Sequence, residues 1–177
     1  MAHDGNAERE FRPLNIAILT VSDSRTLQTD TSGQLLVDRA ETAGHCVAAR
    51  QLEPDDKYRI RLRLSEWIAD PQIDAVVTTG GTGVTGRDGT PEAAQPLLDK
   101  VIDGFGELFR AISHKDIGTS TLQSRCIAGV ANGTVVFCLP GSGNACATGW
   151  DHLIVHQLDH RTRPCNLVEL MPRMMEK

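Results

Sequence analysis

The stretch DAVVTTGGTGVTGRDGTPEA, from Asp74 to Ala93, combines a strand, a glycine loop and a helix start. The run Ile73–Thr79 is rich in β-branched residues and predicts a buried strand. Glycines follow at Gly80, Gly81, Gly83 and Gly86. A backbone without Cβ atoms can turn several N–H groups toward one anion. Because Thr90 and Pro91 then predict a helix N-cap and first helical position, the stretch indicates a phosphate-binding site.

Asp88 stands inside this loop. A carboxylate beside phosphate groups is repulsive unless a cation lies between them. Mg²⁺ is commonly held by one or two carboxylates together with phosphate oxygens. The loop therefore predicts metal-assisted phosphate chemistry, although a long glycine loop without a ligand is the alternative.

Two common nucleotide motifs overlap the loop, and neither fits its context. Gly81–Gly86 matches GxGxxG, but the dinucleotide fingerprint opens its helix directly, whereas Arg87-Asp88-Gly89 intervenes here. That fingerprint also places an acidic residue about 20 residues on, at the end of the next strand. A P-loop would carry Lys-Ser/Thr where this chain has Arg87-Asp88. We therefore expect neither NAD binding nor a Walker-type NTPase.

The composition is that of one globular domain, predicted over residues 14–177, after a flexible polar tail at residues 1–13. The net charge is −5 with no long basic run, so nucleic acid is not an expected partner. No run approaches about 18 apolar residues, so no membrane span is predicted. The five cysteines form no CxxC pair and no secretory signal is present, which favours reduced thiols and a cytoplasmic location.

Strands and helices alternate along the chain. Buried strands are predicted at Leu14–Val21, Cys46–Leu52 and Ile73–Thr79, and helices starting at Thr31, Asp55, Pro91 and Phe105. A hairpin turning at Asn132-Gly133 is predicted to join Ile127–Ala131 to Val135–Leu139, before a last helix that runs to about Leu158. This order predicts an α/β fold with three α/β/α layers, a mostly parallel sheet and a β-hairpin addition.

Two of these helices have specific expected limits. The helix from Pro91 is predicted to reach about Val101, and the next one spans roughly Phe105–His114. Its apolar face is predicted to comprise Leu108, Phe109 and Ile112. After the last helix, the apolar residues of the tail RTRPCNLVELMP predict that it packs against the domain.

Polar loops follow four of the predicted strands, at Ser22–Asp30, Glu53–Asp56, Gly80–Gly89 and Leu139–Asn144. Ligands of parallel α/β sheets bind beyond the carboxyl ends of the strands. All four loops carry groups suited to phosphate or metal. We therefore expect them to form one site.

With these loops identified, the chain resembles the MoaB/Mog family of molybdenum-cofactor biosynthesis proteins, which includes the gephyrin G domain. The resemblance covers residues 14 to 158 and lies in LTVSDS, DTSG, Pro54-Asp55, TTGGTG with RDGTPEA, Ser124-Arg125 and LPGS. GTSTLQSR and QLDHRTRPCN are more similar to the MoaB branch. The family implies a homotrimer, or a hexamer of paired trimers, and a separate molybdate-inserting enzyme as a further partner.

The resemblance implies molybdopterin adenylyltransferase activity, in which AMP passes from ATP to the molybdopterin phosphate with Mg²⁺ as cofactor. It implies catalytic roles for Asp55 and Asp88, with Asp88 as the metal ligand. The nucleotide-binding residues would be Ser22, Asp23, Gly80, Gly81, Thr82 and Gly83. Ser142 and Asn144, at the start of the last helix, would hold the pterin phosphate or ring.

Several of these residues have plainer interpretations. Asp55 can cap its helix, Ser22-Asp23 can form a turn, and Arg87 can be a solvated side chain. The three histidines His152, His156 and His160 can share a helix face with or without a metal. The chain departs from the family pattern at Gly143-Asn144, after LPGS, where some relatives have a lysine. At the level of function, the alternatives are a non-catalytic carrier of the pterin or nucleotide, and a hydrolase using the same site.

Overall fold

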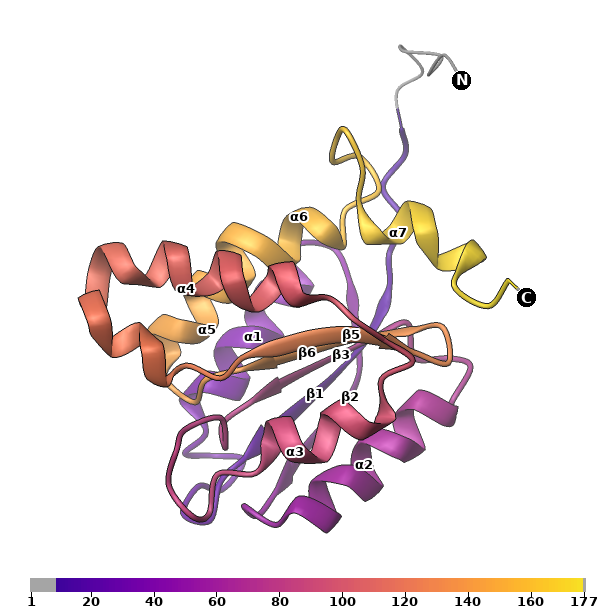
Figure 1. Cartoon of the computed structure of the whole chain (residues 1–177). Helices are drawn as coiled ribbons and strands as arrows, with labels where there is room; N and C mark the ends of the chain where they lie inside the picture. Colours follow the sequence, from indigo (N-terminus) through magenta and orange to yellow (C-terminus); the bar gives the residue numbers. More distant parts are fainter. Residues whose placement is uncertain (1–8, 177) are drawn as a thin grey trace.

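The computed structural model describes residues 9–176, which form one six-stranded sheet with helices on both faces (Figure 1). The strand order is β2-β1-β3-β6-β5-β4. Strands β2, β1, β3 and β6 are parallel, and β5 and β4 run antiparallel to their neighbours. The predicted three-layer α/β/α fold is therefore confirmed.

The strands are β1 (Asn15–Val21), β2 (Cys46–Glu53), β3 (Ala75–Thr79), β4 (Lys100–Val101), β5 (Ile127–Ala131) and β6 (Thr134–Leu139). The α-helices are α1 (Thr31–Thr42), α2 (Lys57–Ala69), α3 (Thr90–Ala94), α4 (Asp103–Ile117), α5 (Gly143–Gly149), α6 (Val155–Gln157) and α7 (Leu167–Leu170). Short 3₁₀ turns form η1 (Gln95–Leu97), η2 (Gly118–Gln123) and η4 (Met171–Arg173), and η3 (Trp150–Ile154) is a π-helical turn between α5 and α6.

Strand β1 supplies both cores because its side chains alternate between the two faces of the sheet. Ile16 and Ile18 lie in the core beneath α1, α4 and α5, and Ala17 and Leu19 lie in the core beneath α2 and α3. Both faces are covered by helices, so the strand reads as a continuous apolar run. The run Leu14–Val21 thus correctly predicted a buried strand.

The connections out of β1 and β3 diverge. The chain leaves β1 through α1 toward β2 at one edge, and it leaves β3 through α3 toward β4 at the other edge. Helices α1 and α3 also lie on opposite faces of the sheet (Figure 1). Such a divergence opens a crevice beyond the carboxyl ends of the two strands. The loops Ser22–Asp30 and Gly80–Gly89 border it.

The helix after the glycine loop is shorter than predicted. It ends at Ala94 and is followed by the turn η1 and the edge strand β4, so the predicted extension to Val101 is wrong. Pro96 lies in η1, where it has no N–H to donate to the preceding turn and its ring crowds that turn. Two further residues then pair with β5 instead.

The structure defines the N-caps of α1 and α3. Helix α1 begins at Thr31, as predicted, and Asp30 caps it, because its carboxylate accepts a hydrogen bond from the N–H of Gly33 at 2.8 Å. Thr90 is the first residue of α3 and not its N-cap, which is Gly89. The Thr90 hydroxyl donates instead to the carbonyl of Gly80 at 2.8 Å. It therefore ties the helix to the glycine loop.

Helix α4 extends beyond its predicted limits and buries a narrower face. Phe105 and Phe109 are buried and Ile112 is partly buried, but Leu108 is 52% exposed. Only a single stripe of a helix faces the sheet, and Leu108 lies beside that stripe. Its place in the predicted apolar face is therefore wrong.

The hairpin prediction is confirmed. Strands β5 and β6 pair antiparallel, and Asn132 and Gly133 have φ of 49° and 83°. Positive φ at both central residues is the type I′ geometry that suits the twist of a hairpin. The closing helix also matches its prediction, since it continues through η3 to Gln157.

The two ends of the described chain pack together. The guanidinium of Arg9 donates two hydrogen bonds of 3.0 Å to Glu169, and Phe11 lies 5.1 Å from the His45 ring, between ring centroids. Val168 is buried, so the C-terminal segment packs as predicted. Residues 9–13 are thus held to the domain and are not a tail, while residues 1–8 lie outside the described residues.

All five cysteines are free thiols, as expected, and three of them are buried. Burial raises the pKa of Cys146 to about 11 and that of Cys138 to about 12, so both thiols stay protonated as core residues. Within residues 9–176, no helix is long and apolar enough to cross a membrane.

Asp30→Ala should lower the free energy of unfolding by about 2–4 kcal/mol. The buried Asp30 carboxylate accepts from Gly33, from the Thr20 hydroxyl at 2.7 Å and from Arg50 at 3.2 Å, and truncation leaves these donors unpaired. Urea denaturation measures the change. Asp38→Ala on the exposed face of α1 is the control and should change stability by less than about 0.5 kcal/mol. Equal effects of the two variants would contradict the role of Asp30.

Candidate functional site

The four polar loops meet at the carboxyl edge of the parallel strands, as predicted. The N–H of Ser22 donates to the carbonyl of Glu53 at 2.9 Å, which joins the first two loops. The N–H of Gly80 donates to the carbonyl of Leu139 at 3.1 Å, and the Thr79 hydroxyl donates to the carbonyl of Pro140 at 3.1 Å. Each loop is therefore held against a neighbour at the crevice between β1 and β3.

Two glycines allow the loop after β3 to approach its neighbours. Gly80 and Gly81 have φ of +99° and +65°, a region that disfavours residues with side chains. A Cβ atom on Gly80 would lie 2.2 Å from the carbonyl oxygen of Val21. One on Gly81 would lie 2.4 Å from the Thr90 hydroxyl and 2.9 Å from a carboxylate oxygen of Asp55. Both glycines are thus required by the close packing of the site.

The loop offers fewer N–H groups to an anion than its glycines suggest. The N–H of Gly80 is already bonded to Leu139, so it is not available to a phosphate as predicted. Among the described residues, the N–H groups of Gly81 and Thr82 donate to no other group. The Thr82 side chain is 3% exposed, and its predicted hydroxyl contact to phosphate stays a prediction. The available anion donors are therefore backbone groups at Gly81 and Thr82.

Asp88 closes the far end of the glycine loop. One carboxylate oxygen accepts from the Thr85 hydroxyl at 2.5 Å and from the Thr85 N–H at 2.9 Å. These bonds, together with the N–H of Gly83 and the positive charge of Arg125, lower the pKa of Asp88. Asp88 is thus both a turn residue and an ionised carboxylate at the crevice.

Asp55 is not the cap of α2. The neighbouring Asp56 takes that role, accepting from the N–H groups of Tyr58 and Arg59 at 2.8 and 3.0 Å. Within residues 9–176, the Asp55 carboxylate forms no ion pair, although the backbone N–H of Asp23 and the charge of Arg87 partly stabilise its ionised form. Burial raises the pKa of Asp55, and the charges of Asp23 and Asp88 raise it further. Asp55 therefore supplies an incompletely compensated carboxylate close to the charges of Asp23 and Asp88.

An ion pair crosses the crevice from the first loop to the glycine loop. The guanidinium of Arg87 donates to both oxygens of Asp23 at 2.6–3.0 Å. Asp23 also accepts from the N–H of Asp55 at 3.0 Å. The neighbouring Ser22 hydroxyl accepts from the N–H groups of Ser24 and Arg25, so it forms a turn. Asp23 thus connects three loops, and Arg87 is not simply solvated.

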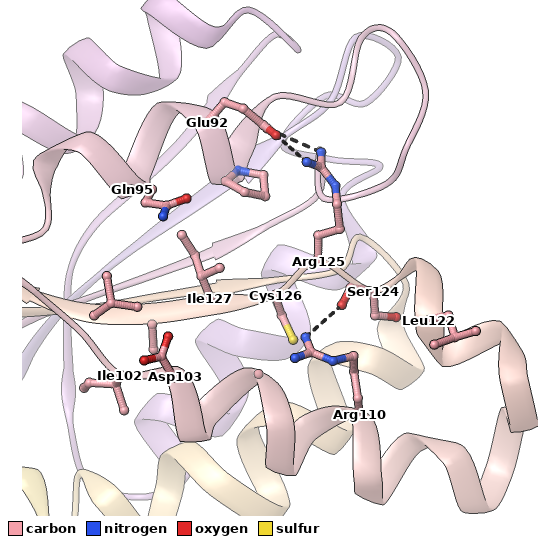
Figure 2. Close-up of a pocket in the computed structure, with 14 residues that line it drawn as sticks. Glu92, Gln95, Ile102, Asp103, Arg110, Leu122, Ser124, Arg125, Cys126 and Ile127 are labelled. Atoms are coloured by element: carbon pink, nitrogen blue, oxygen red, sulfur yellow. Dashed lines mark hydrogen bonds and ion pairs between the residues drawn. The ribbon is translucent and has the colours of Figure 1, made fainter.

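Arg125 is a site residue to which the sequence assigned no role. Its Nε donates to the carbonyl of Gly83 at 2.8 Å, and its guanidinium pairs with Glu92 of α3. Figure 2 shows this pair at the rim of a pocket of about 350 Å³ between α3, α4 and β5. The contact spans 42 positions of sequence, and no local pattern predicts it. Arg125 thus links the glycine loop to α3 through Gly83 and Glu92.

Ser142 and Asn144 line a different pocket, of about 370 Å³, beside the start of α5. The Ser142 hydroxyl accepts from the N–H of Ala145 at 3.2 Å and caps the helix. A Cβ atom on the neighbouring Gly141 would lie 3.2 Å from the Cα of Gly80. The pocket therefore adjoins the glycine loop.

The described side chains do not by themselves complete a metal site. Within residues 9–176, no group of three or more His, Cys, Asp or Glu side chains could hold a metal ion. The spacing of His152, His156 and His160 thus forms no metal site, and His160 lies past the end of α6. Asp55 and Asp88 supply two carboxylates, the number that Mg²⁺ commonly uses when phosphate oxygens complete its shell.

Known proteins similar to this chain include proteins of molybdenum cofactor biosynthesis. Residues 17–160 match a family model described as a probable molybdopterin binding domain. The chain is 53% identical over 157 residues to molybdenum cofactor biosynthesis protein B of Escherichia coli (strain K12), covering 89% of this chain and 92% of that protein.

Solved structures show the same fold. A crystal structure of molybdenum cofactor biosynthesis protein B matches with a TM-score of 0.82 and 43% identity, over 89% of this chain and 96% of that one. The tungsten cofactor synthesizing protein MoaB from Pyrococcus furiosus matches with a TM-score of 0.72 and 39% identity, over 81% and 91%. The family match over residues 17–160 spans all four loops of the site.

Asp55→Asn should raise the melting temperature at pH 7. The raised pKa means that the folded state binds the Asp55 proton more tightly than the unfolded state. Ionisation of Asp55 therefore destabilises the fold as pH rises from its ordinary value of 3.8 through the raised one, and asparagine removes this effect. Thermal melts of both proteins between pH 3 and 8, without divalent cations, test this. A difference in melting temperature that does not shrink toward acidic pH would contradict it.

Proposed function

The chain belongs to the MoaB/Mog family of molybdenum cofactor biosynthesis proteins, and from this premise we propose that it is a molybdopterin adenylyltransferase. In the proposed reaction, an oxygen of the molybdopterin phosphate attacks the α-phosphorus of ATP. The bond from that phosphorus to pyrophosphate breaks, and AMP remains joined to the pterin phosphate. Such a reaction gathers negative charge on several oxygens, so positioning and neutralisation supply most of the catalysis.

The observation that carries this proposal is the incompletely compensated Asp55 carboxylate, whose pKa is raised by burial and by the charges of Asp23 and Asp88. The negative charge of Asp88 raises the pKa of Asp55, a bound cation would offset this repulsion, and carboxylate oxygens suit Mg²⁺. A bound Mg²⁺ would polarise the phosphate oxygens and neutralise the developing charge. The free N–H groups of Gly81 and Thr82 lie in the same loop and would hold a phosphate.

The second substrate is assigned to the pocket at Ser142 and Asn144. Their polar groups stand at the start of α5 and would hold the phosphate of the pterin. Gly141 contacts the glycine loop at Gly80, so that phosphate would lie beside the nucleotide phosphates. Holding both reactants in adjacent pockets is the main means by which such a site accelerates transfer.

We also propose a cytoplasmic homotrimer or hexamer that passes its product to a molybdate-inserting enzyme. Apolar side chains supporting self-association are exposed around α4 and η2, at Leu108, Ile117 and Leu122. Large exposed apolar side chains of this kind are available for protein–protein contacts.

A non-catalytic carrier is the second candidate, and one observation favours it. The Asp88 carboxylate is already bonded to the hydroxyl and N–H of Thr85, which closes the loop without a metal. A protein that only binds the pterin or nucleotide would need no more than this. The two candidates differ in whether Asp88 acts on the rate of a reaction.

Asp88→Asn should reduce adenylyl transfer by about 10²-fold or more, because it removes a charged metal contact from the transition state. The assay mixes the purified protein with molybdopterin and Mg·ATP and measures AMP–pterin and pyrophosphate. Glu107→Gln, on the exposed side of α4, is the matched control and should leave the rate unchanged. If the unmodified protein binds molybdopterin but forms no AMP–pterin, the adenylyltransferase proposal is wrong and the carrier hypothesis is favoured. An unchanged rate in Asp88→Asn would refute the metal assignment.

A further inference from the structure

Besides Ser142 and Asn144, the pocket at the start of α5 has a second polar side. Opposite the start of α5, the last turns of α4 contribute Ser113 and Asp116 to its lining. Between these groups, apolar walls come from Phe109, Pro140 and Ala145. The volume of about 370 Å³ lies within the range of small-molecule sites. A flat, mostly apolar ring with one polar edge fits this arrangement.

Asp116 is unusual for its place in the fold. It lies in the last turn of α4, where the helix dipole disfavours a negative charge. Among the described residues, its carboxylate has neither a hydrogen-bond donor nor an ion-pair partner. The cations next to it in sequence do not share its helix face, since neighbours on a face are three or four residues apart. The carboxylate is thus left free to accept hydrogen bonds from a ligand in the pocket.

We propose that Asp116 is the specificity-determining residue for the substrate's ring, accepting two hydrogen bonds from the amino-pyrimidinone edge of a pterin. This inference rests on the proposed placement of a pterin in this pocket. The 2-amino group and N3–H of a pterin are adjacent parallel donors, and a carboxylate can accept both at once. With the phosphate at Ser142 and Asn144, the far edge of the ring would be directed toward α4.

The chemistry gives a specificity test that needs no catalysis. A lumazine has a 2-oxo group in place of the 2-amino group of a pterin. Its N3–H can still donate to Asp116, but its oxygen faces the second carboxylate oxygen. An asparagine at this position reverses the match, because its amide oxygen accepts from N3–H and its amide nitrogen donates to the 2-oxo group. Asp116→Asn should therefore exchange the preferred ring.

The experiment titrates the full-length protein with the phosphate monoesters of 6-hydroxymethylpterin and 6-hydroxymethyllumazine, without nucleotide, and follows ligand fluorescence. The unmodified protein should bind the pterin probe about 10-fold or more tightly than the lumazine probe. Asp116→Asn should prefer the lumazine probe, and Asp116→Ala should bind the two about equally. Glu107→Gln on the same helix is the control and should keep the original preference.

Two results would overturn the inference: equal or absent binding of both probes by the unmodified protein, or an unchanged pterin preference in Asp116→Asn. The outcome is separate from that of the adenylyl-transfer assay. If Asp116→Asn reverses the ring preference and the unmodified protein transfers no AMP, the ring site is supported and the proposed adenylyltransferase activity is rejected. Conversely, if the unmodified protein transfers AMP and Asp116→Asn still prefers the pterin probe, the adenylyltransferase proposal stands and the role of Asp116 is refuted.

Discussion

The site depends on the close approach of the backbone at Gly80 and Gly81 to the end of β1 and to Asp55. Side chains at these glycines would meet the Val21 carbonyl and the Asp55 carboxylate. Because the loop turns there without a Cβ atom, Thr90 can bond the Gly80 carbonyl and bring the start of α3 to the crevice. The same turn leaves the N–H of Gly81 without a partner among the described residues. The close approach at this turn thus places the Asp55 carboxylate and the Gly81 N–H at the same crevice.

The charges at the crevice are unevenly satisfied. Arg87 neutralises Asp23 through a two-oxygen ion pair, and hydrogen bonds stabilise ionised Asp88. Asp55 has no ion pair among the described residues, and burial and the nearby negative charges raise its pKa despite a backbone hydrogen bond from Asp23. An arrangement with one unsatisfied carboxylate is strained without a cation and relieved by one. This imbalance connects the folded arrangement of the loops to the proposed metal-assisted transfer.

Local sequence patterns predicted most of the architecture but not its details. The strands followed from β-branched runs, and the hairpin followed from Asn132-Gly133, because each is decided within a few residues. The predicted extension of α3 to Val101 is wrong because Pro96 interrupts an apolar pattern that otherwise continues. Arg125 received no role, since its contact to the glycine loop joins distant segments. Local sequence patterns therefore predicted elements decided within a few residues, but not contacts between residues far apart in the sequence.

The sequence by itself determined the family, the α/β class and the gathering of four polar loops at one edge of the sheet. Those features depend on apolar periodicity and on glycine and proline positions, which are local properties. Only the tertiary structure decided that Asp56 caps α2 and leaves Asp55 free, that Asp23 binds Arg87, and that Asp116 lies across a pocket from Ser142. The role of each of these carboxylates depends on which donors folding brings within hydrogen-bond distance, and that is not encoded at any single position.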